Sequence, residues 1–136
     1  MTLGFITPEY PHKSIKSSAG IGTSMGNLVP GLIAHGVSVV LFVYGQDADE
    51  KIVEAGLTLY RIKSRKYKFG SWFFSRKHLE RFVTKKVLEH KIDALEAPDW
   101  TGPTAFCRFP VPLTIRLHGS DTLFCTIENR RQKLKN

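Results

Sequence analysis

A glycine-rich loop that leads into a helix occupies Ser17–His35 (SSAGIGTSMGNLVPGLIAH) and lies between two apolar runs. The first run, Leu3–Thr7, is short and ends at Pro8. The second run, Val37–Tyr44, is almost entirely apolar and rich in valine, as expected of a strand that is covered on both faces. Because a strand, a helix and a second buried strand form a βαβ unit, this part of the chain predicts a parallel sheet.

The same alternation continues to the end of the sequence. We expect further strands at Leu57–Ile62, Ile92–Glu96 and Leu113–Leu117. We expect helices at Gly20–His35 and Trp72–His90, and shorter ones at Asp49–Ala55, Gly102–Arg108 and Thr126–Lys135. Gly36 is expected to cap the first helix, and Pro30 to kink it near Gly26. The sequence therefore predicts a single α/β domain over residues 1–136, with a Rossmann-like parallel sheet of about five strands and helices on both faces.

The glycine-rich loop is a candidate anion site. Gly20 and Gly22 lack a Cβ atom, so a bulky anion can approach the main chain closely. The start of the following helix adds unpaired N–H groups and the positive end of the helix dipole. This pattern is typical of a phosphate or diphosphate cradle. The alternative is a tight strand-to-helix turn in which glycine only relieves crowding.

Two further polar segments follow predicted strands: Glu96–Trp100 (EAPDW) and His118–Asp121 (HGSD). Ligands of parallel sheets bind outside the carboxyl ends of the strands, so we expect both segments to share one cleft with the glycine-rich loop. There the imidazole of His118 can donate to a substrate hydroxyl or phosphate, with Asp121 orienting it. Asp99 and Trp100 are suited to a sugar, through its hydroxyls and its C–H groups. The alternative is a structural histidine and a tryptophan in the core.

The charge is uneven. The formal net charge is +8, and positive residues concentrate in Arg61–Lys91, where they alternate with aromatic side chains. Such a mixture is typical of docking onto an anionic membrane surface. Nucleic acid is less favoured, and the structural alternative is a solvated basic face with its aromatics in the core. The membrane-surface candidates are Lys66, Lys68, Trp72, Arg76, Lys77 and Arg81.

The cysteines, the apolar runs and the N-terminal residues indicate where in the cell the protein is located. Cys107 and Cys125 are the only cysteines, and they lack metal-ligand spacing, so we expect reduced thiols and no metal site. No apolar run approaches the roughly 20 residues that span a bilayer. The N-terminus lacks the basic and apolar regions of a signal peptide. We expect a cytoplasmic protein, peripheral at the inner membrane face if the basic region is used.

Four segments, in this order, resemble the N-terminal domain of family 4 glycosyltransferases, which have the two-domain GT-B architecture. The segments are LGFIT, AGIGTSMGNLVPGLIAHGVSVVLF, IDALEAPDWTG and PLTIRLHGSD. The resemblance implies transfer of a sugar, with retention, from a nucleotide-diphosphate donor to a hydroxyl of a glycan, a lipid-linked acceptor or a small molecule. It implies no essential metal and no cofactor beyond the sugar nucleotide.

Such enzymes bind the nucleotide in a second domain, and nothing in this sequence resembles one. We therefore expect an acceptor-side N-terminal domain, truncated at its C-terminus and inactive by itself, with an exposed sheet edge open to self-association.

The resemblance also implies residue roles. The backbone N–H groups of the loop would stabilise charge on the departing diphosphate, and His118, the expected catalytic residue, would contact the transferring sugar. Ala19 stands where the family has the first glycine of a pair. The residues implied to contact the donor diphosphate are Gly20, Ile21 and Gly22. Those implied to face the acceptor are Glu9, Thr23, Asp99, Trp100 and Asp121.

Two other functions are compatible with the sequence. Gly20-Ile-Gly22-Thr-Ser-Met-Gly26 resembles the fingerprint of a dinucleotide-binding domain, but about a dozen residues separate it from its strand and no acidic residue ends the second strand. The other function is that of a non-enzymatic module that binds through its basic face. Arg76, Lys77 and Arg81 would then carry the binding.

Overall fold

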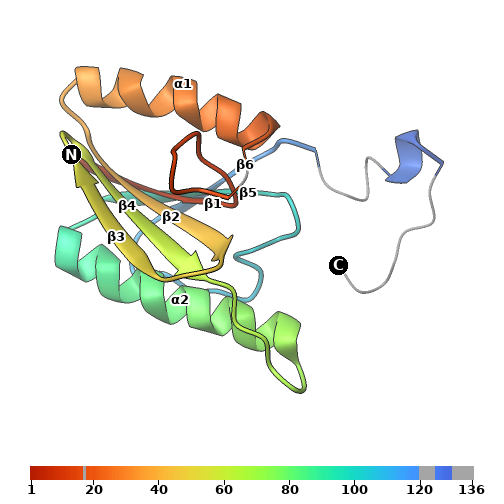
Figure 1. Ribbon diagram of the computed structural model, residues 1–136. Helices are drawn as coiled ribbons and strands as arrows, with labels where there is room; N and C mark the ends of the chain where they lie inside the picture. The colour runs from red at the N-terminus through yellow and green to blue at the C-terminus, as the bar shows by residue number, and fades with distance from the viewer. Residues whose placement is uncertain (17, 120–124, 130–136) are drawn as a thin grey trace.

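The computed structural model describes residues 1–16, 18–119 and 125–129. The helices α1 (Gly20–Ala34) and α2 (Ser71–His90) cover a six-stranded sheet with the order β3-β4-β2-β1-β5-β6 (Figure 1). The strands are β1 (Thr2–Thr7), β2 (Ser38–Gln46), β3 (Glu50–Glu54), β4 (Leu57–Lys63), β5 (Ala94–Pro98) and β6 (Leu113–Arg116). All neighbours pair in parallel except β3, which is antiparallel to β4. The expected α/β class is confirmed, with one strand more than expected.

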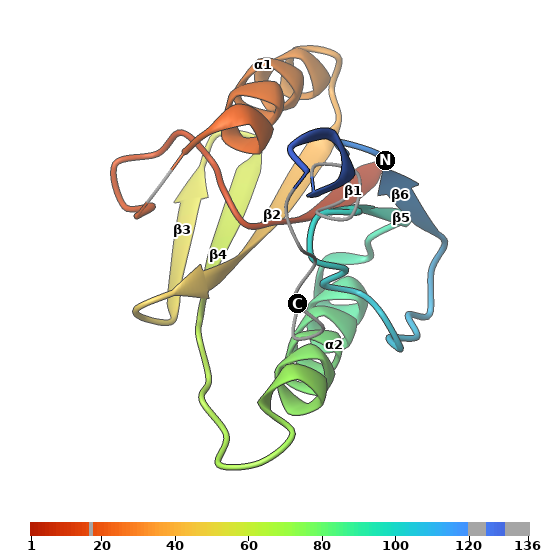
Figure 2. The same ribbon diagram turned by 90° about the vertical axis from the view of Figure 1, so that its right-hand side faces the viewer.

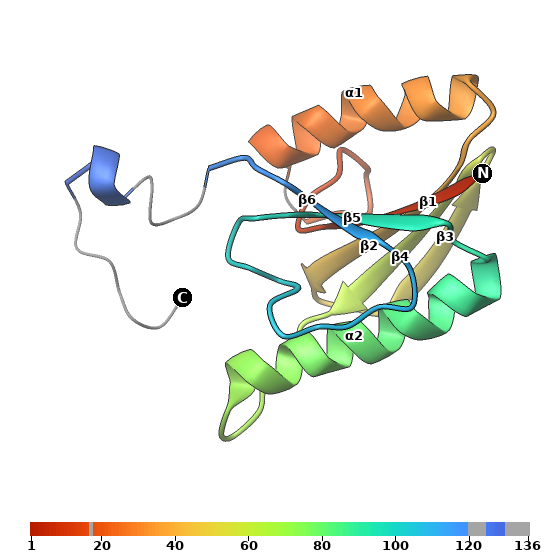
Figure 3. The same cartoon turned by 180° about the vertical axis from the view of Figure 1, so that it is seen from behind.

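The two helices lie on opposite faces of the sheet (Figures 1 and 3). Alternate residues of the central strand β2 supply both cores, because successive side chains of a strand point to opposite faces. Leu41 packs on the α1 side with Met25 and Val29. Phe42 packs on the α2 side with Val83. This explains why β2 reads as an unbroken apolar run.

The end of α1 follows a recognised capping pattern. The Gly36 N–H donates to the Ile33 carbonyl at 2.9 Å, and the Val37 N–H donates to the Leu32 carbonyl at 3.1 Å. These two bonds form a Schellman motif, and Gly36 adopts the left-handed φ of 76° that this motif requires. The expected cap is confirmed. Pro30 is exposed and α1 runs through it without interruption, so the kink near Gly26 stays a prediction.

The helix expected at Asp49–Ala55 is wrong. This segment contains strand β3, which forms a hairpin with β4 through Ala55 and Gly56. Ile52 packs against the core on the α1 side, while its neighbours Lys51 and Val53 are exposed, which is the period-two pattern of an edge strand. An ion pair of 2.6 Å between Arg61 and Glu50 crosses the hairpin. Tertiary pairing with β4 therefore overrides the helix propensity of the acidic segment.

The helix expected at Gly102–Arg108 is also wrong. Thr101, Gly102 and Phe106 adopt left-handed φ values of 58°, 53° and 62°, which interrupt a right-handed helix. Side chains of α2 bind the carbonyls of this loop instead: Arg76 binds Thr101 and Gly102, and Lys77 binds Phe106. Within the helix expected at Thr126–Lys135, the described residues contribute only to one helical turn over residues 125–127, and residues 130–136 lie outside the described ones.

No helix in the described part of the chain has the length and apolar character needed to cross a membrane.

Candidate functional site

The candidate site lies at the edge of the sheet where the parallel strands end. The N-terminal ends of both helices point to this edge, which faces the viewer in Figure 2. The loop from β1 to α1, the segment after β5 and the segment after β6 all leave the sheet here. The glycine-rich loop, Asp99 and His118 therefore lie at one edge of the sheet, and the cleft that they were expected to share stays a prediction.

The carboxylate of Glu9 lies at the start of α1. One carboxylate oxygen of Glu9 accepts hydrogen bonds from the Ala19 N–H at 2.7 Å and from the Gly22 N–H at 3.0 Å. Thr7 fixes Glu9 in turn, because its hydroxyl donates to the Glu9 carbonyl and accepts from the Glu9 N–H. A carboxylate at this position satisfies unpaired N–H groups and complements the helix dipole. Glu9 therefore acts as a cap for α1.

The two glycines of the loop have different surroundings. A Cβ atom on Gly22 would lie 2.2 Å from the Ser18 hydroxyl and 3.2 Å from the Glu9 Cβ, so protein atoms fill the space beside it. A Cβ atom on Gly20 would meet nothing within 4 Å. Of the neighbouring residues, Ile21 packs on the α1 core, and the Thr23 hydroxyl donates to the Ala19 carbonyl at 3.0 Å. The main chain at Gly20 is thus uncrowded and exposed.

Asp99 ties the segments after β5 and β6 together. Its N–H donates to the Arg116 carbonyl at 3.1 Å, and its carboxylate accepts from the backbone N–H of His118 at 2.9 Å. Next to it, Arg116 forms a two-bond ion pair with Glu96 at 2.6 and 2.9 Å, which raises the Arg116 pKa. The backbone of His118 is therefore fixed beside Asp99. Trp100 is half-buried next to it, and Asp121 lies outside the described residues.

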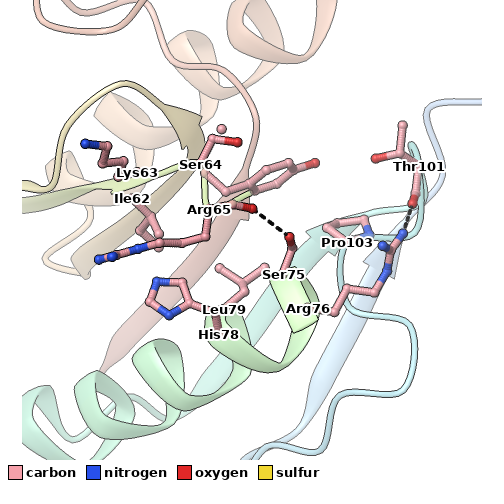
Figure 4. Close-up of a pocket in the computed structure, with 12 residues that line it drawn as sticks. Ile62, Lys63, Ser64, Arg65, Ser75, Arg76, His78, Leu79, Thr101 and Pro103 are labelled. Carbon is pink, nitrogen blue, oxygen red and sulfur yellow. Dashed lines mark hydrogen bonds between the residues drawn. The ribbon is translucent and has the colours of Figure 1, made fainter. Parts of the chain in front are cut away.

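A pocket of about 180 Å³, which the sequence did not predict, lies on the α2 side of the same edge (Figure 4). It lies between the ends of β2 and β4, the loop after β4, the N-terminal half of α2 and the loop after β5. Its lining includes hydroxyl groups and cationic side chains but no carboxylate. The polar and charged lining residues are Tyr44, Lys63, Ser64, Arg65, Ser75, Arg76, His78 and Thr101. Only Arg76 of these was a candidate from the sequence.

Two buried polar atoms line this pocket without a hydrogen bond of good geometry: the Tyr44 hydroxyl and Nε2 of His78. Burial raises the pKa of Tyr44 to about 12, which the nearby Thr101 side chain and the Arg76 charge only partly offset. Burial lowers the pKa of His78, and the adjacent Arg65 charge lowers it further. Both groups are thus held in their neutral forms at neutral pH. No sequence signal identified them, because they meet only in the folded chain.

The membrane-surface candidates fall into two groups. Arg76 and Lys77 have structural roles: the Arg76 guanidinium stacks 3.7 Å from the Trp72 ring and donates to the Gly102 carbonyl at 2.8 Å, and Lys77 binds Glu80. The others, Lys66, Lys68 and Arg81, are exposed, as is the Trp72 ring. Among the described residues there is no group of three or more histidine, cysteine or acidic side chains that could hold a metal ion.

The fold and this edge define an α/β domain of Rossmann-like topology whose polar loops gather at the carboxyl ends of its parallel strands. Neither protein-family models nor curated proteins gave a match to the chain.

Proposed function

We propose that the chain is the acceptor-side domain of a glycosyltransferase that moves a sugar, with retention, from a nucleotide-diphosphate donor to an acceptor hydroxyl. One arrangement carries the proposal: the start of α1, Asp99 with Trp100, and His118 lie at the same edge of a parallel sheet. Ligands of such sheets bind at this edge. The same residues carry the resemblance to family 4 glycosyltransferases.

In this proposal the backbone at the start of α1 would bind the donor diphosphate, and side chains after β5 and β6 would bind the sugars. The N–H groups near Gly20 would stabilise charge on the diphosphate leaving group, since they need no rearrangement to do so. His118 would donate to a hydroxyl of the transferring sugar. Asp99 accepts a hydrogen bond from the His118 N–H, so it would hold His118 in place besides facing the acceptor.

The position of Glu9 adds a condition to this proposal. Its carboxylate occupies the N–H groups of Ala19 and Gly22, and it would repel a diphosphate there. Donor binding would therefore require the Glu9 side chain to move away from α1. The carboxylate would be free to face the acceptor after that movement.

The test is a titration of the isotopically labelled full chain, followed through its amide resonances. The probes are inorganic pyrophosphate, UDP-glucose and NAD. We expect pyrophosphate and UDP-glucose to shift the amides of Gly20, Ile21 and Gly22. Glu9→Gln should bind pyrophosphate about fivefold more tightly, because it removes a like charge worth about 1 kcal/mol at a helix N-terminus. Glu89→Gln, the same charge change at the far end of α2, should bind as the unaltered chain does.

The titration separates the candidate functions. Absence of shifts at Gly20–Gly22 with pyrophosphate and UDP-glucose would overturn the assignment of a donor diphosphate site. NAD binding tighter than UDP-glucose would favour a dinucleotide-binding domain. Shifts confined to α2 would favour a module that binds through its basic face.

A further inference from the structure

A corner of the molecule exposes several aromatic rings together. Phe69 lies in the loop after β4 and is 79% exposed, and Phe73 and Phe74 lie at the start of α2 and are 44% and 49% exposed. Phe73 and Phe74 contact each other edge to face at 5.7 Å between ring centroids. Large apolar rings normally lie in the core, so a cluster of exposed ones indicates a surface that another apolar phase covers.

Unpaired positive charge surrounds these rings. Lys66, Lys68 and Arg81 are exposed and have no acidic partner among the described residues. Two carboxylates of neighbouring segments are paired with other cations, since Glu80 binds Lys77 and Asp49 binds Arg65. We call Phe69, Phe73, Phe74, Lys66, Lys68 and Arg81 the aromatic–basic patch. Its positive charge is not neutralised within the described part of the molecule.

The aromatic–basic patch projects from a rigid support. The loop after β4 and the first turn of α2 extend beyond the sheet in Figures 1 and 2. The opposite face of α2 is fixed in the core by Leu79, Val83 and Val87. The exposed parts of the rings can therefore contact another phase while the core face of α2 stays packed on the sheet.

We propose that the aromatic–basic patch docks this protein onto the surface of an anionic lipid bilayer. The phenylalanine rings would enter the boundary between head groups and acyl chains, and the lysine and arginine side chains would bind lipid phosphate and carboxylate groups. This inference does not depend on the proposed sugar transfer, because it uses none of the residues at the start of α1 or after β6.

The charge of the patch distinguishes a bilayer from the other occupants. A second copy of the chain meeting this patch about a two-fold axis would place like charges opposite one another. A single-stranded nucleic acid would need a groove that tracks its backbone. The rings here belong instead to the loop after β4 and the first turn of α2, which project beyond the sheet. An anionic bilayer matches both the rings and the charge.

The test is co-sedimentation of the full chain with vesicles of phosphatidylcholine alone or enriched in phosphatidylserine. We expect binding to the phosphatidylserine vesicles only. The double variant Lys66→Glu with Lys68→Glu should bind roughly 20-fold more weakly or worse, since each cation near the surface contributes about fivefold. The matched control is Lys13→Glu with Lys85→Glu, which makes the same change in net charge at exposed positions outside the patch and should retain binding.

A second pair of variants tests the aromatic part. Phe69→Ser should weaken vesicle binding several-fold. The control is Leu88→Ser, which should not weaken it: Leu88 is also largely exposed, at 69%, but lies at the far end of α2. Trp72 directly precedes Phe73 in the first turn of α2 and is 42% exposed, so its fluorescence should shift to shorter wavelength on binding, and Trp72→Phe should remove the shift.

Three results would overturn the inference. The first is equal loss of vesicle binding in the Lys66/Lys68 and Lys13/Lys85 variants, which would mean that only net charge matters. The second is an absence of vesicle binding together with Phe69-dependent dimers in sedimentation velocity, which would assign the patch to a second copy. The third is tighter binding to single-stranded DNA than to phosphatidylserine vesicles, with the same dependence on Lys66 and Lys68.

Discussion

Single side chains at the carboxyl edge decide which chemistry the edge can offer. Glu9 neutralises the start of α1 from within the chain, and Asp99 fixes the backbone at His118. Tyr44 presents a neutral hydroxyl in a pocket that contains no carboxylate. At this edge the start of α1 is therefore already bound by the Glu9 carboxylate, whereas the pocket beside Tyr44 has no carboxylate in its lining.

The raised pKa of Tyr44 makes stability depend on pH in the alkaline range. The folded-state pKa of about 12 lies above the ordinary value of 10, so the folded chain retains the proton more strongly. The protonated Tyr44 hydroxyl therefore adds to the free energy of unfolding. This stabilisation is fully present below pH 10 and is lost as the pH rises through 12, by roughly 2–3 kcal/mol at most. We expect Tyr44→Phe to lose less stability than the unaltered chain between pH 9 and pH 11.5, measured by urea unfolding.

The matched control for this prediction is Tyr67→Phe, at a ring that is exposed in the loop after β4. It should follow the unaltered chain at every pH. Identical pH profiles for Tyr44→Phe and the unaltered chain would contradict the role of burial at Tyr44.

At the scale of elements, the β3–β4 hairpin and α1 depend on each other. The hairpin turn contains Gly56, whose φ is 77°, and a Cβ atom there would lie 2.6 Å from the Ile33 Cγ2 of α1. Glycine is therefore required twice at this position, once for the backbone and once for the close approach of the helix. The turn of the β3–β4 hairpin and the end of α1 therefore approach each other closely at this point.

We expect Gly56→Ala to destabilise the chain by about 2 kcal/mol, since it combines left-handed strain of about 1 kcal/mol with overpacking of similar size. The measurement is the midpoint of urea unfolding. Gly31→Ala is the matched control, because a Cβ atom there meets nothing within 4 Å and Gly31 lies inside α1. It should stabilise the chain by about 0.5–1 kcal/mol. A Gly56→Ala variant as stable as the unaltered chain would mean that the turn and α1 separate easily.

At the scale of the whole molecule, the two edges of the sheet differ in how they discourage pairing with another chain. Strand β3 carries Glu50, Lys51 and Glu54 at exposed positions, and charged side chains protect an edge from pairing. Strand β6 exposes Ile115, and Leu117 follows it at 80% exposure. The β6 edge is therefore the open one among the described strands.

We expect weak, concentration-dependent self-association through β6, detectable by sedimentation velocity. Ile115→Lys should reduce it, because a charge on an edge strand opposes pairing. Val53→Lys places the same charge on the β3 edge, where Val53 is 67% exposed, and should leave the association unchanged. Association that responds equally to both substitutions would contradict the assignment to β6.

Much of the fold could be read from the order of residues. The apolar runs around Leu41 and Phe5, the period of α2 and the glycine after α1 are local signals, and each produced the expected element within a few residues. The order of strands and helices also determined that polar segments far apart in the chain share one edge. The individual elements depend on near neighbours in sequence, and the shared edge follows from their alternating order, so the sequence by itself determined both.

Tertiary structure alone decided the rest. The acidic segment around Ile52 is a strand because it pairs with β4. The segment around Gly102 is a loop, and its carbonyls accept hydrogen bonds from Arg76 and Lys77. The pocket beside Tyr44 joins residues from four separate segments, and the carboxylate of Glu9 meets the Gly22 N–H across thirteen positions. Such contacts form only when distant segments are packed together, so no local pattern records them.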